Sequence, residues 1–304
     1  MEAPGGTLAA SAIVPTAGRP ELIAACVRSI EACRPAPAEV VVVDQSGGGA
    51  VAAALAGTGA RVVPCRGRGI ALAMNTGLRA ARHDVVLVTN DDCTVAPDWV
   101  AVAWRHLAAQ PRGLVSGRVL PGGEGASVPS LRDDPEPRDF SGEPSFGALY
   151  AGNMALDRRE ALALGGFDER RTLRLAAEDN DFGYRWLRSG RPLAYEPAMT
   201  VWHHDWRTPD ELVRRWAEYA RGQGALYAKH LHAGDRWILR RVASDLRGAL
   251  RAELRGLARG EPRAADERRA ALYWLPVGLV EGWLESVALA RRAASGGSPS
   301  RRPR

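Results

Sequence analysis

Residues 85–92 read Val85-Val86-Leu87-Val88-Thr89-Asn90-Asp91-Asp92, and this stretch decides the fold. Four consecutive apolar residues, three of them β-branched, are typical of a strand that is buried on both faces. Such strands belong to parallel sheets, which bind their ligands at the carboxyl ends of the strands. The stretch therefore predicts an α/β domain and places its site at the polar end, residues 89–92.

The residues before this stretch repeat the same pattern. Short apolar runs at 11–15, 40–43 and 61–63 predict three more strands, and apolar residues at helical spacing predict helices between them. An alternation of strands and helices implies a parallel sheet with right-handed crossovers. We therefore expect the loops at Pro15, Asp44 and residues 90–92 to meet at one edge of the sheet.

Two adjacent carboxylates, Asp91 and Asp92, follow the strand at 85–88. They repel each other unless a cation joins them. Mg²⁺ typically binds one or two carboxylates together with phosphates, so one interpretation is a divalent metal that holds a diphosphate. The other is a solvated turn ahead of a helix that starts near Asp98. Both interpretations stay open on these residues alone.

A second acidic cluster, Glu178-Asp179-Asn180-Asp181, stands at a predicted helix start. The helix dipole favours acidic residues there, which accounts for one or two of the charges. The functional alternative is a general base that faces a substrate hydroxyl. His203 and His204 follow a predicted strand at 199–202. Because neighbours on a strand point to opposite faces, at most one of them faces a site.

In their order along the chain, these segments resemble the family 2 glycosyltransferases, and the resemblance runs from about Ala12 to about Tyr227. Each segment alone is weak, whereas the ordered set is specific. The segments are 13–16 with Arg19; 41–46; 68–69 through 75–77; 89–93 with Pro97 and Trp99; and 165–169 followed by 178–181. The resemblance implies a GT-A fold, a Rossmann-like, mostly parallel central sheet flanked by helices. It also implies an inverting, metal-dependent transfer of a sugar from a nucleotide sugar to an acceptor hydroxyl.

The resemblance also implies roles for the matching residues. Asp179 is the expected catalytic base, beside Glu178, and Asp92 with His203 is expected to bind a divalent metal, Mg²⁺ or Mn²⁺. Asp44 is expected to contact the base of the donor, which favours a UDP- or dTDP-sugar. The remaining residues expected along the nucleotide sugar are Pro15, Thr16, Arg19, Arg68, Asn75, Asn90 and Asp91.

The chain departs from the family pattern at two positions. Asn90 and Gln45 stand where the family often has Asp, and an amide is a weaker metal ligand than a carboxylate. Two other functions are therefore weighed: a nucleotidyltransferase, which would normally carry a Gly-rich basic loop early in the chain, and a non-catalytic protein that only binds nucleotide sugars. The presence of Asp92, Glu178 and Asp179 argues against the non-catalytic protein.

The charge distribution and the long loop at 121–146 suggest how the chain is organised. Residues 1–210 hold 22 arginines and 25 acidic residues, whereas residues 211–304 hold 19 basic and 10 acidic residues. We predict a catalytic domain at 1–210, with a nucleotide-binding half at about 8–110 and an acceptor half at about 111–210. A helical extension at 211–294 and a disordered tail at 295–304 follow. Residues 121–146 are predicted to form an irregular loop over the donor.

The extension carries two stripes at helical spacing. The first comprises Arg247, Arg251, Arg255 and Arg259, and the second comprises Leu246, Leu250, Leu254 and Leu257. We favour packing of the leucines on the catalytic domain, with attachment to an anionic membrane surface as the alternative. Residues 270–290 are apolar, but Glu281 and Glu285 near their centre argue against a membrane span.

Several classes are not expected. The arginines accompany no nucleic-acid reading motif, so nucleic acid is not an expected partner. The four cysteines form no CxxC pair, and the first 20 residues have no secretory pattern. We therefore expect a cytoplasmic protein with reduced thiols, in peripheral contact with the inner face of the cell membrane if residues 211–294 bind it.

Overall fold

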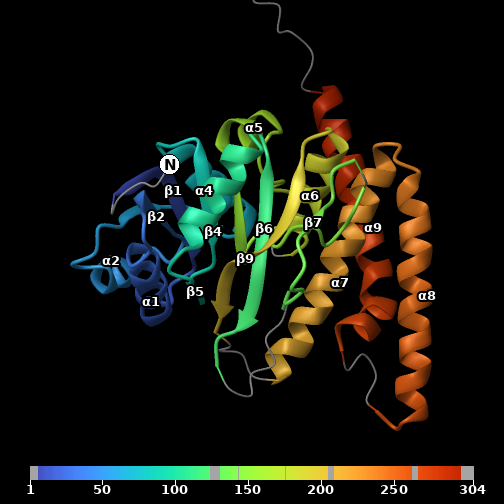
Figure 1. The fold of residues 1–304 in the computed structure, drawn as a ribbon. Helices are drawn as coiled ribbons and strands as arrows, with labels where there is room; N and C mark the ends of the chain where they lie inside the picture. The colour runs from blue at the N-terminus through green and yellow to red at the C-terminus, as the bar shows by residue number, and fades with distance from the viewer. Residues whose placement is uncertain are drawn as a thin grey trace, which may run out of the picture. The chain divides into compact units, whose positions relative to one another are not determined.

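The computed structural model describes residues 6–123, 131–142, 144–174, 176–204, 209–261 and 266–295. The chain divides into two compact units. The first comprises Met1–Glu169 and Glu178–Trp206, and the second comprises Arg170–Ala177 and Arg207–Arg304. Figure 1 labels the elements of each unit. In the first unit, the described residues form a nine-stranded sheet of order β3-β2-β1-β4-β8-β6-β9-β5, with β7 paired to β9.

The first half of the sheet is the parallel arrangement that the sequence predicts. β1 (Thr7–Thr16) pairs in parallel with β2 (Ala36–Asp44) on one side and with β4 (Val85–Thr89) on the other. β3 (Arg61–Pro64) continues the sheet in parallel beyond β2. Thr16 is the register partner of Asp44, so the polar residues that end these strands lie at one edge.

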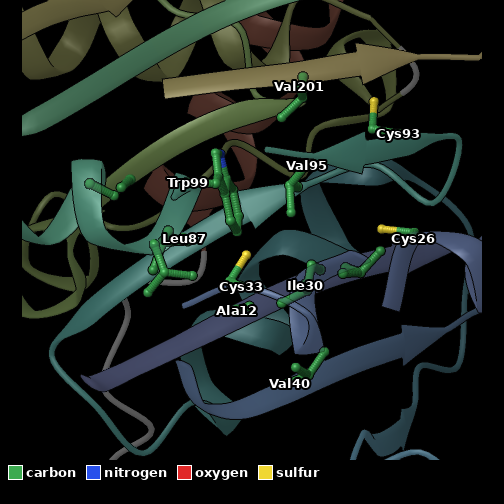
Figure 2. Packing of buried hydrophobic residues seen from close by; sticks show 14 of the residues in the cluster. Ala12, Cys26, Ile30, Cys33, Val40, Leu87, Cys93, Val95, Trp99 and Val201 are labelled. Atoms are coloured by element: carbon green, nitrogen blue, oxygen red, sulfur yellow. The ribbon is translucent and has the colours of Figure 1, made fainter. Parts of the chain in front are cut away.

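Helices cover both faces of the sheet because side chains alternate along each strand. Ala12 and Val14 of β1 belong to one core cluster, part of which is shown in Figure 2, and Ile13 belongs to the other. The first cluster includes residues of α1 (Pro20–Glu31), α2 (Ala50–Ala54) and α4 (Trp99–Ala109). The second includes residues of α3 (Ile70–Ala80), α5 (Arg158–Ala163) and α6 (Glu178–Arg188). A Cβ on Gly77 would lie 2.4 Å from Ile13 Cγ2, so α3 packs directly on β1.

The second half of the sheet has mixed directions. β8 runs antiparallel to β4 and β6, whereas β6 and β9 are parallel, with a register shift after Gly117. Buried Asn153 fills this irregularity, because its amide donates to the carbonyls of Arg118 (2.8 Å) and Met199 (2.7 Å) and accepts from Trp99 Nε1 (2.8 Å). The bounds are β5 (Cys93–Val95), β6 (Leu114–Pro121), β7 (Arg138–Asp139), β8 (Asn153–Asp157) and β9 (Leu193–His203).

The described part of the loop predicted at 121–146 contains regular structure. β7 pairs antiparallel with β9, and Arg132 exchanges two backbone hydrogen bonds with Val119 (2.8 and 3.0 Å). The Arg132 guanidinium also lies 4.1 Å from the centre of the Tyr195 ring. The prediction of an irregular loop is therefore confirmed only in part. The sequence has no apolar run there that would indicate a strand as short as β7. Residues 124–130 and 143 lie outside the described residues.

The second unit consists of helices: η1 (Arg171–Leu173), α7 (Pro209–His232), α8 (Trp237–Ala258) and α9 (Glu267–Ser295). α7 and α9 touch at backbone distance, since a Cβ on Gly278 would lie 1.9 Å from Arg221 O. Glu285 of α9 accepts hydrogen bonds from the backbone N–H groups of Arg171 (2.9 Å) and Thr172 (3.0 Å). Residues 296–304, in the predicted disordered tail, lie outside the described residues.

Three leucines of the predicted stripe lie at the surface of the second unit. Leu250, Leu254 and Leu257 of α8 are 47%, 59% and 43% exposed, so they are not buried within this unit, and the packing of the leucine stripe on the catalytic domain stays a prediction. α8 buries Ile238, Ala249, Glu253 and Gly256. Apart from Ile238, these are small or charged residues, which a hydrophobicity pattern assigns to the outside. No helix in the described part of the chain is long and apolar enough to cross a membrane.

Candidate active site

Polar side chains gather at the carboxyl edge of the parallel strands, as the sequence predicts. Thr16 ends β1, Asp44 ends β2, and Asp91 and Asp92 follow β4. Asp91 and Asp92 are almost completely buried, at 1% and 3% exposure. Buried carboxylates need partners, because desolvation disfavours their charged form. The turn is therefore not the solvated one that was the alternative interpretation.

Arg19 joins the two carboxylates. Its Nε donates to Asp91 Oδ2 (3.0 Å), its Nη1 donates to Asp92 Oδ2 (3.0 Å), and its Nη2 also pairs with Asp91. Thr16 Oγ1 donates to Asp91 Oδ2 (2.6 Å). Burial raises the pKa of the Asp91 carboxyl, while the Arg19 cation opposes that rise. Thr16 and Arg19, which were expected along the nucleotide, hold the acidic pair in place in this structure. Pro15 and Thr16 are the last two residues of β1.

His203 lies on the other side of Asp92. Cys93 of β5 is the register partner of His203 in β9, so both side chains lie on the same face of this antiparallel pair. His203 Nε2 is 3.4 Å from Asp92 Oδ1. His204 is directed elsewhere, since its Nε2 lies 2.9 Å from Thr94 Oγ1. The structure thus brings His203, and not its neighbour, to the acidic pair.

These residues fit a divalent metal ion. Both ring nitrogens of His203 are buried and have no hydrogen-bond partner among the described residues. Such orphaned groups are costly unless something binds them. Asp92, Cys93 and His203 each offer one ligand atom within 4.8 Å of the others. A carboxylate oxygen and an imidazole nitrogen are both common ligands of divalent metal ions, so the donor set suits a divalent metal.

The residues after β2 and β3 hold one another. Asp44 Oδ1 accepts hydrogen bonds from the backbone N–H (2.8 Å) and the hydroxyl (2.6 Å) of Ser46. Gln45 Nε2 donates to the carbonyls of Gly67 (3.0 Å) and Gly69 (3.2 Å), which ties the loop of Arg68 to the end of β2. The Arg68 side chain is exposed. Gln45, a departure from the family pattern, thus serves to position this loop.

Asn75 has a set of partners that its sequence motif did not reveal. Its Nδ2 donates to Phe167 O (2.8 Å) and Glu169 Oε1 (2.7 Å), and its Oδ1 accepts from Phe167 N (2.8 Å). Gly166 lies against the same amide, because a Cβ there would stand 2.4 Å from Asn75 Oδ1. Asn75 therefore clamps the segment that leads to the second acidic cluster.

That second cluster begins α6. Asp179 is partly exposed, and its carboxylate accepts from the backbone N–H groups of Asn180 (2.7 Å) and Ala151 (3.5 Å). Burial raises the pKa of the Asp179 carboxyl. Glu178 is buried, and Asp181 pairs with Arg185 (2.7 Å).

Residues 151–152 connect the two acidic clusters. Ala151 donates to Asp179, and the next residue, Gly152, faces Asn90, because a Cβ on Gly152 would lie 2.8 Å from Asn90 Nδ2. Asn90 and Asp179, which belong to the two predicted clusters, therefore both lie against the same two-residue segment. Ala151, Gly152 and Cys93 were missed from the sequence. Cys93 directly follows the acidic pair, which is the one signal that could have found it.

Comparison with known proteins identifies the family of this chain. The model of glycosyl transferase family 2 matches residues 11–163. Pre-mycofactocin glycosyltransferases of Mycobacterium tuberculosis are 30% identical over 172 residues, which cover 54% of this chain and 36% of theirs. The chain thus spans about a third of the length of the curated relatives it matches.

Two solved structures show the same fold. A mannosyltransferase from Pyrobaculum calidifontis, in complex with GDP-Man and Mn²⁺, aligns with a TM-score of 0.55 at 20% identity, over 96% of this chain and 76% of its own. GalNAc-T7 with UDP, GalNAc and Mn²⁺ aligns with a TM-score of 0.52 at 18% identity, over 74% and 51%. The GT-A fold, with its central sheet flanked by helices and its C-terminal helices, is therefore confirmed.

Proposed function

Because this chain belongs to glycosyl transferase family 2, we propose that it transfers a sugar from a nucleoside-diphosphate sugar to an acceptor hydroxyl, with inversion at the anomeric carbon. One observation carries the proposal. The buried Asp92 carboxylate stands between Arg19 and an imidazole that has no hydrogen-bond partner among the described residues, and Gly152 and Ala151 connect this group to Asp179. A charged ligand site and a basic carboxylate thus lie along one edge of the sheet.

Asp92 and His203 are the proposed ligands of a divalent ion, Mg²⁺ or Mn²⁺. The two structural neighbours contain Mn²⁺ together with a nucleotide sugar or with UDP and a sugar, which supports this assignment. When bound, the ion supplies positive charge that offsets the charge building on the diphosphate leaving group. Arg19 keeps the neighbouring carboxylates of Asp91 and Asp92 together, so that Asp92 Oδ1 stays directed toward His203.

Asp179 is the proposed general base. Its carboxylate is held by two backbone N–H groups, and its raised pKa makes it a stronger base than an exposed aspartate. It takes the proton of the acceptor hydroxyl as that oxygen attacks the anomeric carbon, and a single displacement inverts the configuration. Glu178, buried directly before it, is proposed to help position this start of α6.

Asp44, Arg68 and Asn90 are proposed to lie along the nucleotide sugar. Asp44 keeps its Oδ1 on Ser46, and its other oxygen is proposed to accept from the N3–H of uracil or thymine. The structural neighbours hold GDP-Man in one case and UDP in the other, so they favour no single base. The proposal of a UDP- or dTDP-sugar therefore depends on Asp44.

A calorimetric titration with UDP, dTDP and GDP, each with and without Mn²⁺, tests this proposal. We expect binding that requires Mn²⁺ and that is tighter for UDP or dTDP than for GDP. The anomeric configuration of the sugar released or transferred from the preferred donor, followed by NMR, should be opposite to that of the donor. Retained configuration, or binding of all three nucleotides without Mn²⁺, would contradict the mechanism proposed here.

A further inference from the structure

We propose that α8 attaches the protein reversibly to the surface of an anionic phospholipid bilayer. Its exposed leucines would enter the boundary between headgroups and acyl chains, and its exposed arginines would contact the lipid phosphates. The proposal concerns where the enzyme works and does not depend on its donor or acceptor. It sharpens the membrane alternative that the sequence left open for residues 211–294.

The first observation is an excess of exposed apolar side chains on the second unit. Of the fourteen large hydrophobic residues that are exposed in the described part of the chain, twelve belong to this unit. Four of them are on α8: Leu239, Leu250, Leu254 and Leu257, with exposures of 56%, 47%, 59% and 43%. A unit that only had to pack against itself would not leave such a set in water, so these side chains point to an apolar surface that covers them.

The second observation is the order of residues around α8. The dipeptide Leu-Arg occurs at 239–240, 246–247, 250–251 and 254–255. Consecutive residues of an α-helix are rotated by about 100°, so the arginines form a stripe directly beside the leucines. Arg240, Arg247, Arg251 and Arg255 are all exposed. This pairing of an apolar stripe with a basic one is the pattern of helices that lie in a membrane interface.

The third observation is that the four arginines beside the leucines have no acidic partner in the described part of the chain. Arg240, Arg247, Arg251 and Arg255 form no ion pair with another described residue, whereas Arg259, at the end of the stripe seen in the sequence, pairs with Glu261 (3.5 Å). The two acidic residues of α8 are engaged elsewhere, since Asp245 pairs with Arg241 (3.1 Å) and buried Glu253 pairs with Arg269 (2.7 Å). The exposed face of α8 therefore carries only positive charge, which matches a negatively charged surface. Guanidinium groups also suit phosphate oxygens, because they donate two parallel hydrogen bonds.

These charges favour a lipid surface over the other occupants of an apolar face. A second copy of this chain would place two unpaired arginine stripes close to each other, and like charges repel. A membrane-spanning mode is not supported either, since no described helix qualifies as a span. The surface that covers α8 must therefore combine an apolar layer with negative charge, and an anionic bilayer has both.

Sedimentation with vesicles tests the proposal. The full chain should bind vesicles of phosphatidylglycerol and phosphatidylcholine at low salt, release at high salt, and bind pure phosphatidylcholine vesicles weakly. Changing Arg240, Arg247, Arg251 and Arg255 to Gln should weaken binding by about fivefold per arginine. A matched control changes four exposed arginines of the first unit, Arg28, Arg34, Arg82 and Arg105, to Gln, and it should bind like the parent.

A second measurement tests the proposal even if the quadruple variant does not fold. All four native cysteines are buried, so Leu254→Cys gives a selective site for an environment-sensitive dye. Its emission should shift to the blue with anionic vesicles, whereas the dye on Arg105→Cys should not respond. The proposal fails if the unmodified chain does not sediment with anionic vesicles at low salt. It fails also if the Leu254→Cys dye responds only to protein concentration, which would identify a second copy as the occupant.

Discussion

The two acidic clusters of the site differ in what surrounds them. At 90–92, Arg19 touches both carboxylates, and His203 approaches Asp92 from the other side. At 178–181, the Asp179 carboxylate pairs with no cation in the described part of the chain, and only backbone N–H groups hold it. Burial raises the pKa of Asp91 and of Asp179, but a guanidinium opposes the rise only at Asp91.

The difference separates two kinds of chemistry on one sheet edge. A carboxylate between fixed cationic or ligating groups stays ionised and suits a metal ion. A carboxylate with a raised pKa and no cation suits the removal of a proton. We therefore expect changes in the two clusters to affect different measurements, metal affinity in the first and turnover in the second.

The largest effect is expected at Asp179. Asp179→Asn keeps the shape of the side chain and removes its basicity, so turnover should fall by roughly 10²- to 10⁴-fold. Affinity for Mn²⁺ and for the nucleotide should stay as in the parent, as measured by calorimetry. Asp98→Asn, an exposed aspartate at the start of α4, serves as the control and should leave turnover unchanged. If turnover of Asp179→Asn is normal, Asp179 is not the base, and the proton-removing role proposed for the second cluster is wrong.

The next largest effect is expected at Asp92, whose removal should weaken metal binding. Asp92→Ala should reduce Mn²⁺ affinity by more than about a hundredfold, the upper end of what even an outer-shell partner contributes. Asn90→Asp is the informative counterpart, since it adds a carboxylate to the same turn and should keep or strengthen Mn²⁺ binding. Titration calorimetry with Mn²⁺ and UDP compares the three proteins. Unchanged Mn²⁺ affinity in Asp92→Ala would place the metal elsewhere.

Much of the fold follows from the sequence because buried parallel strands consist of continuous apolar runs. The runs at 40–43 and 85–88 predicted β2 and β4, and the polar residues that follow them meet at one edge as expected. The alternation of side chains along a strand predicted that at most one of His203 and His204 faces a site, and the resemblance to the family favoured His203. The structure places His203 beside Asp92 and directs His204 to Thr94.

The rest depends on contacts between distant residues, which no local pattern contains. Asn75 and Phe167 are 92 residues apart, so the clamp between them is invisible in either motif. β5 has three residues and β7 has two, too few for a periodicity to emerge. The inward face of α8 contains Glu253, whose burial is compensated by Arg269 of another helix. In the sequence alone, a charged residue whose partner lies on another helix cannot be distinguished from a surface residue.

The pH dependence of turnover sharpens the comparison further. A general base acts when it is deprotonated, so kcat/KM should fall as the pH drops through the pKa of Asp179. Because burial raises that pKa, the fall should occur above the ordinary range of an aspartate. A pH profile of kcat/KM for the parent should show this acidic limb, and the residual activity of Asp179→Asn should lack it. A limb that persists in the variant would assign the titration to another group.

The smallest expected effect concerns the backbone that enters the second cluster. Ala177, directly before Glu178, has a φ of +66°, whereas the residues around Asn90 have no positive φ. A left-handed conformation costs a residue with a Cβ about 1–2 kcal/mol, and glycine avoids most of this strain. Glycine also loses more entropy on folding, by about 0.5–1 kcal/mol. Ala177→Gly should therefore raise the free energy of unfolding by roughly 0.5 kcal/mol, which a denaturant titration can resolve.

Ala176→Gly is the control, since Ala176 has no positive φ and the same change there should only destabilise. If Ala177→Gly is more stable but turns over more slowly, the strained backbone helps to place Glu178 and Asp179; if it is less stable, the strain assigned to this position is absent.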